Sequence, residues 1–165
     1  MAAKSDFTAQ EWSQLIESAM LASVAVTAAD PSGLWGALQE GFASATGLVG
    51  ARSSETPLIK DIVAALATSE GRTIATDAIK LRLKGAQAGD AVQSSITAIA
   101  AVTKILDAKA GPDAVPFKTW LYANAERVAL ASSEGGFLGF GGQKVSEKER
   151  ATLAQLSASL GLSAS

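Results

Sequence analysis

The sequence contains no histidine and no cysteine, and these two absences remove most familiar catalytic sites. Without an imidazole, a serine nucleophile lacks its usual general base and zinc lacks its usual nitrogen ligand. Without a thiol, there is no cysteine nucleophile, no disulfide and no thiolate metal site. We therefore predict a protein that is not an enzyme and that holds neither a metal nor another cofactor.

Clustered carboxylates are also missing from the sequence. The 16 Asp and Glu residues are scattered, and none are spaced three or four residues apart, the spacing that would place two carboxylates on one helical face. Asp30, Asp90, Asp113 and Glu149 stand where helices are expected to begin, so we interpret them as helix caps. An enzyme that uses only carboxylates and lysine from distant helices is the alternative.

Charge and long apolar runs are scarce, which limits the partners of the chain. A net charge of −2 gives no general attraction for nucleic acid, so we expect none to bind. The longest apolar stretch, residues 19–29, contains Ser23 and Thr27 and falls short of the ~20 residues of a membrane span. Residues 1–12 lack a basic start followed by an apolar run, so we expect no transmembrane segment and a cytoplasmic location.

The apolar residues that are present favour helices. They make up 48% of the 165 residues, only 5% are aromatic, and alanine, the strongest helix former, is the most frequent residue. A chain of this length fits one domain with its own core. We therefore predict a single all-α domain over residues 1–165, a compact orthogonal or up-down helical bundle.

Apolar periodicity and capping patterns divide the chain into about seven helices behind a flexible start at residues 1–7. Thr8 with Glu11, and Ser146 with Glu149, match the capping box that opens a helix. Gly161 is expected to end the last helix. The predicted helices cover residues 8–29, 31–46, 57–70, 73–84, 90–110, 114–132 and 146–160.

The segment 73–84 is the least certain of these helices. Ile79, Leu81 and Leu83 alternate with charged residues, which is the period of a strand, so a hairpin is the competing interpretation. We favour a helix because a lone strand would have nothing to pair with.

A glycine-rich loop, residues 133–145, contains the first candidate contact site. Phe137, Leu138 and Phe140 lie among its glycines, and exposure of large apolar side chains costs about 1.5–3 kcal/mol each relative to burial. The loop either folds back as a plug of the bundle, or acts as a lid over an apolar cavity or an anchor on a partner.

The second candidate site is a small basic cluster that could bind an anion. It consists of Arg72, Lys80, Arg82 and Lys84 and could bind phosphate or an acidic surface. A solvated helix face is the alternative. Trp12, Trp35 and Trp120 lie on apolar helical stripes, so we predict that they belong to the core.

The turn at 28–30 and the tail at 146–162 resemble tellurite-resistance domains of the TerB type. That resemblance implies acidic metal ligands after the first Asp turn. Here Pro31, Ser32, Gly33 and Leu34 follow Asp30, so we do not predict the metal site and do not adopt the family.

Two functional hypotheses follow from these patterns. The first is a soluble protein that acts through an unknown protein partner or through self-association. The second is a bundle that binds an apolar small molecule or lipid and is gated by residues 135–142. An apolar cavity of ligand size beneath Phe137 to Phe140 would favour the second hypothesis, whereas a flat apolar patch would favour the first.

Overall fold

The computed structural model describes residues 1–29, 55–134 and 145–162, and the helices in these ranges confirm the all-α class. Six of the expected helices are described, and the expected helix at 31–46, with Trp35, lies outside the described residues. The elements are η1 (Lys4–Asp6), α1 (Ala9–Ala29), α3 (Pro57–Ala67), α4 (Ser69–Leu83), α5 (Ala88–Lys109), η3 (Gly111–Asp113), α6 (Ala114–Glu134) and α7 (Glu147–Leu160).

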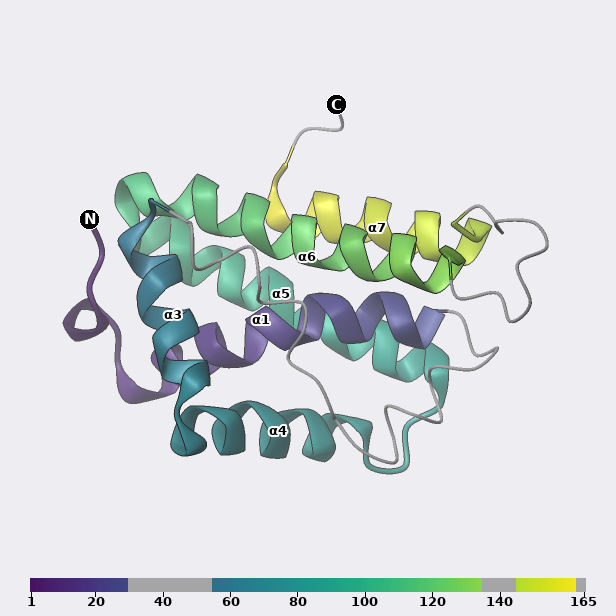
Figure 1. Ribbon diagram of the computed structural model, residues 1–165, viewed down its shortest axis with the longest axis horizontal. Helices are drawn as coiled ribbons and strands as arrows, with labels where there is room; N and C mark the ends of the chain where they lie inside the picture. Colours follow the sequence, from purple (N-terminus) through teal and green to yellow (C-terminus); the bar gives the residue numbers. More distant parts are fainter. Residues whose placement is uncertain (30–54, 135–144, 163–165) are drawn as a thin grey trace.

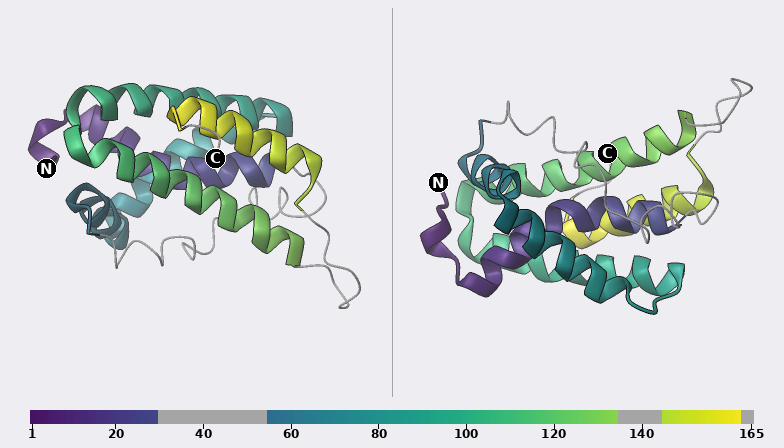
Figure 2. Two further views of the ribbon diagram at one scale, coloured as in Figure 1. Left: turned by 90° about the horizontal axis from the view of Figure 1, so that it is seen from above. Right: turned by 60° about the horizontal axis from the view of Figure 1, so that its bottom comes forward.

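Helix α1 is the centre of the bundle and contacts every other described α-helix. Helices α6 and α7 lie side by side along one side of it, α4 runs along the opposite side, and α3 crosses steeply at one end (Figures 1 and 2). Helix α5 packs most extensively against α1. A central helix must be apolar on nearly all sides, and α1 satisfies this with buried positions such as Leu15, Ala22 and Val26.

The two predicted capping boxes are confirmed. Thr8 donates its backbone N–H to the Glu11 carboxylate at 2.7 Å and accepts from the Glu11 N–H at 3.2 Å. Ser146 and Glu149 repeat this exchange at 2.8 and 3.2 Å. Gly161 ends α7 with a φ of 65°, a conformation that favours glycine.

The corner between α3 and α4 corrects a predicted boundary. We expected one helix to end near Gly71 and the next to begin at Thr73, but the break lies at Thr68, whose hydroxyl accepts from the Gly71 N–H at 3.0 Å. Gly71 therefore lies inside α4, where a Cβ would stand 2.0 Å from the Ala65 carbonyl oxygen. Residues 73–83 continue α4, so the helix is confirmed and the hairpin alternative is wrong.

The caps expected at Asp90 and Asp113 also differ in detail. Helix α5 begins at Ala88, and Asp90 accepts from the Gln87 N–H at 3.4 Å from within its first turn. Asp113 is buried and accepts from the Ala2 backbone N–H at 2.8 Å, a tertiary contact. At the other end of α6, Ser133 and Glu134 are helical rather than part of the loop.

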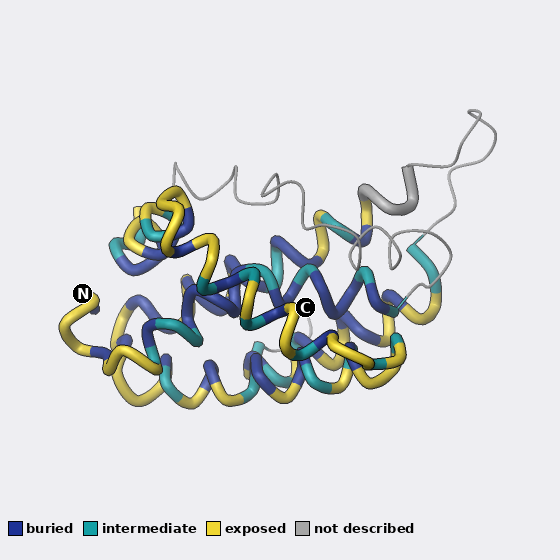
Figure 3. The backbone as a smooth tube through the Cα atoms, turned by 90° about the horizontal axis from the view of Figure 1, so that it is seen from below, coloured by how far each residue is buried: buried dark blue, intermediate teal, exposed yellow. Residues whose placement is uncertain are grey.

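Residues 1–7, expected to be flexible, contain η1 and place Ala2 and Phe7 in the core. Phe7 contacts Trp12 with a ring separation of 6.1 Å. Trp12 and Trp120 are buried, as predicted, and Figure 3 shows the buried positions turned inward along the helices. No described helix has both the length and the apolar character that crossing a membrane requires.

Candidate functional site

Of the two candidate sites predicted from the sequence, the structure describes only the basic cluster. Phe137, Leu138 and Phe140 lie outside the described residues. The basic cluster lies on or directly after α4, but its members do not converge on one point. The Arg72 guanidinium donates to the Ala67 carbonyl oxygen at 2.6 Å at the start of the helix, whereas Arg82, at its end, is paired with Glu17.

Lys80 and Lys84 are exposed, and Lys84 follows the last residue of α4. Two residues that are two positions apart on a helix differ by about 200° in direction, so Lys80 and Arg82 leave opposite sides of α4. A cooperative anion site needs several cations around one point. The described side chains therefore give Arg72, Lys80 and Arg82 separate environments, and Arg82 lines a pocket.

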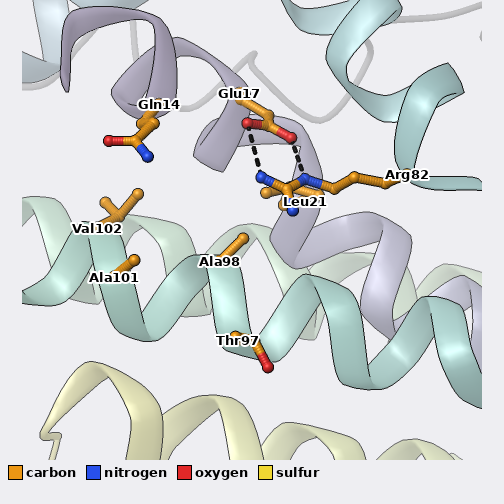
Figure 4. A pocket seen from close by; sticks show the side chains of 8 residues that line it. All are labelled: Gln14, Glu17, Leu21, Arg82, Thr97, Ala98, Ala101 and Val102. Carbon is orange, nitrogen blue, oxygen red and sulfur yellow. Dashed lines mark hydrogen bonds and ion pairs between the residues drawn. The ribbon is translucent and has the colours of Figure 1, made fainter. Parts of the chain in front are cut away.

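That pocket lies between α1, α4 and α5 and has a volume of about 190 Å³. Figure 4 shows Arg82 reaching across from α4, with α1 on one side and α5 on the other. The lining side chains come from all three helices: Gln14, Glu17, Leu21, Arg82, Thr97, Ala98, Ala101 and Val102.

An ion pair between Glu17 and Arg82 forms one wall of the pocket. Nε and Nη2 of Arg82 donate to Oε1 and Oε2 of Glu17, the second at 3.3 Å (Figure 4). Glu17 is only 5% exposed, while the Arg82 side chain is 32% exposed. A carboxylate buried this deeply needs a partner, and the fork of the guanidinium occupies both of its oxygens.

The other walls are mainly apolar, and small side chains leave the space open. Ala98 and Ala101, spaced three residues apart, face the pocket from α5 beside Val102, and Leu21 faces it from α1. An alanine fills little of the space between neighbouring helices, so the two alanines create the hollow. Thr97 uses its hydroxyl to donate to the Gln93 carbonyl oxygen at 2.9 Å.

The pocket offers few groups for acid–base or metal chemistry. It contains one carboxylate, and Arg82 donates one hydrogen bond to each oxygen of that group. Within the described ranges, no three His, Cys, Asp or Glu side chains form a group that could hold a metal ion.

Comparison with known proteins gives no further information about the site. No protein-family model matches the chain, and no curated protein and no solved structure matches it either.

Sequence reasoning missed Glu17, although a signal was present. Most other acids stand near helix starts, whereas Glu17 lies inside the apolar pattern of α1, between Ile16 and Ser18. An acid at such a position has to find a cation in the folded state. The sequence could have marked Glu17 as paired, but not with Arg82, which is 65 residues away.

A second buried polar feature lies on α6. The Trp120 indole N–H and both polar atoms of the Asn124 amide are buried without a hydrogen-bond partner among the described residues. Asn124 is 2% exposed. Unpaired buried groups of this kind cost about 1–3 kcal/mol each, so these groups of α6 destabilise the folded protein.

Proposed function

We propose that the protein is a non-enzymatic binding protein that holds a small, largely apolar molecule in the pocket between α1, α4 and α5. The observation that carries the proposal is the lining: apolar walls meet a charge pair that is already neutralised. Small-molecule sites typically combine an apolar lining with a few fixed polar groups. The pairing of the Glu17 carboxylate with Arg82 supports binding rather than catalysis.

The volume sets the size of the molecule. An apolar cavity of about 150 Å³ in another protein accommodates benzene, so about 190 Å³ suits a compact molecule of similar or slightly larger size. We expect affinities on the order of 0.1–1 mM for simple probes, because so small a ligand makes few contacts.

The alternative, a protein partner or self-association, has less support. Among the described residues, the large apolar side chains that are exposed include Leu81, Val115 and Leu130. Leu81 is on α4, whereas Val115 and Leu130 are at opposite ends of α6. Single exposed apolar residues are ordinary on protein surfaces, so these three do not define a docking surface.

The predicted gating by residues 135–142 is not part of this proposal, since those residues lie outside the described ranges. The proposal uses side chains of α1, α4 and α5 alone. It therefore stands whether the glycine-rich loop is a lid, a plug or an anchor.

A titration with toluene, followed by NMR of ¹³C-labelled alanine methyl groups, tests the proposal. We expect the methyl signals of Ala98 and Ala101 to shift and saturate. Ala101→Leu should abolish the shift of Ala98, because the larger side chain fills the pocket from an exposed position on α5. Ala108→Leu, exposed on the same helix but away from the pocket, is the matched control and should bind as the wild type does. Equal titrations of both variants would refute the proposal.

A further inference from the structure

The guanidinium of Arg82 has hydrogen-bonding capacity that Glu17 does not use. An arginine side chain carries five N–H donors on three nitrogens, and Nε and Nη2 are the two that donate to Glu17. In Figure 4, the third nitrogen, Nη1, lies on the side that faces α5 and Ala98. None of the described residues accepts a hydrogen bond from Nη1.

The charge around Nη1 favours an uncharged ligand. Glu17 lies directly against the guanidinium, so an anion that approached Arg82 would be attracted by one charge and repelled by the other. That anion would also have to lose its hydration in a mostly apolar pocket, which the residual attraction does not offset. A cation would meet the guanidinium itself, which repels it.

We propose that the pocket selects an uncharged small molecule whose hydrogen-bond acceptor, such as a carbonyl oxygen, is held by Nη1 of Arg82 while its apolar body lies against Leu21, Ala98 and Val102. This inference rests on the proposed function, because it requires the pocket to be occupied. It adds the chemical class of the ligand and the atom that recognises it.

The size of the expected preference follows from hydrogen-bond exchange. Arg82 is partly exposed, so a ligand acceptor replaces water at Nη1 rather than satisfying a dry donor. A net hydrogen bond of this kind changes an affinity by about three- to tenfold. We therefore expect that preference for a carbonyl compound over a hydrocarbon of the same shape.

The test compares cyclohexanone with methylenecyclohexane, which differ only in having C=O or C=CH₂. For the wild type, cyclohexanone should bind about three- to tenfold more tightly. Arg82→Lys keeps a cation for Glu17 but removes Nη1, so the ratio should fall to about one. Arg72→Lys, at the other end of α4, is the matched control and should keep the wild-type ratio.

A measurement on the unmodified protein covers the case in which Arg82→Lys does not fold. The ¹⁵N signals of the Arg82 guanidinium should shift with cyclohexanone and stay unchanged with methylenecyclohexane. Equal binding of the two probes would overturn the ligand class and leave the proposed function intact. Tighter binding of cyclohexanecarboxylate than of cyclohexanone would also overturn the class. Absence of binding by every probe would instead refute the proposed function.

Discussion

The backbone N–H of Ala2 donates to the carboxylate of Asp113 at 2.8 Å, across 111 residues of sequence. Both residues are 5% exposed, so this contact fixes the start of the chain against the junction of α5 and α6. The carboxylate also precedes the first turn of α6, where a negative charge is favourable. One side chain thus joins two distant parts of the bundle.

We predict that Asp113→Ala lowers the free energy of unfolding by about 1.5–3 kcal/mol, the range for a hydrogen bond to a charged group. Urea denaturation measures the change. Asp113→Asn keeps an oxygen that can accept from the Ala2 N–H, so it should lower the free energy of unfolding less than Asp113→Ala does. If Asp113→Ala is as stable as the wild type, the contact does not stabilise the fold.

Gly71 should not tolerate a side chain. Gly71→Ala would place a Cβ 2.0 Å from the Ala65 carbonyl oxygen, and the backbone fixes the positions of both atoms, so neither can rotate away. We expect the free energy of unfolding to fall by more than about 2 kcal/mol, because the corner between α3 and α4 has to open. Thermal unfolding followed by circular dichroism measures it.

Gly89 offers the matched control, because it lies in the first turn of α5 and a Cβ there meets no atom within 4 Å. Gly89→Ala should raise stability by about 0.5–1 kcal/mol through its helix propensity. If the two variants change stability by the same amount, steric conflict at Gly71 is not the cause.

Asn124 is predicted to be a position where an apolar side chain stabilises the protein. Asn124→Leu removes two buried polar groups that lack partners and should raise the free energy of unfolding by about 1–3 kcal/mol. Gln93→Leu, at an exposed position of α5, should change it by less than about 0.5 kcal/mol. Destabilisation by Asn124→Leu would mean that the amide has a bonding partner in solution.

The ion pair of Glu11 with Lys109 gives stability a pH dependence. The hydrogen bond from the Lys109 ammonium, at 2.6 Å, and then the backbone N–H of Thr8 hold the pKa of Glu11 below its usual value of 4.5. A lowered carboxyl pKa contributes stability that is fully present above the unfolded pKa and is lost as the pH falls through the folded pKa.

Lys109→Met should therefore raise the pKa of Glu11 toward its usual value and reduce the loss of stability in acid. Titration of the Glu11 carboxyl ¹³C signal measures the pKa directly. Lys104→Met removes an exposed charge from the same helix without touching Glu11, and should leave that pKa nearly unchanged. An unchanged pKa in Lys109→Met would show that Thr8 alone lowers it.

Local features of the fold were predictable from the sequence. The capping boxes at Thr8 and Ser146 depend on residues three positions apart, so sequence and structure carry the same information. The end of α3 was misplaced because glycine after an apolar run indicates a helix end, whereas Gly71 is required by the close approach of Ala65. Close approach is a tertiary property that periodicity does not encode.

The candidate site depends on tertiary contacts, so most of it could not be predicted from the sequence. Arg82 was singled out because of its basic neighbours in the sequence, but its position in the pocket comes from Glu17 on another helix. Helical periodicity indicates which residues share a face, yet it does not indicate which helix that face meets. The hollow beside Ala98 and Ala101 exists only once α1 and α5 have packed.

The binding claim is tested most directly by intermolecular nuclear Overhauser effects from cyclohexanone to the methyl groups of the protein. We predict contacts to Leu21, Ala98, Ala101 and Val102, which come from two helices and line one pocket. Contacts confined to methyl groups elsewhere, or none at a cyclohexanone concentration of about 10 mM, well above the expected dissociation constant, would contradict it.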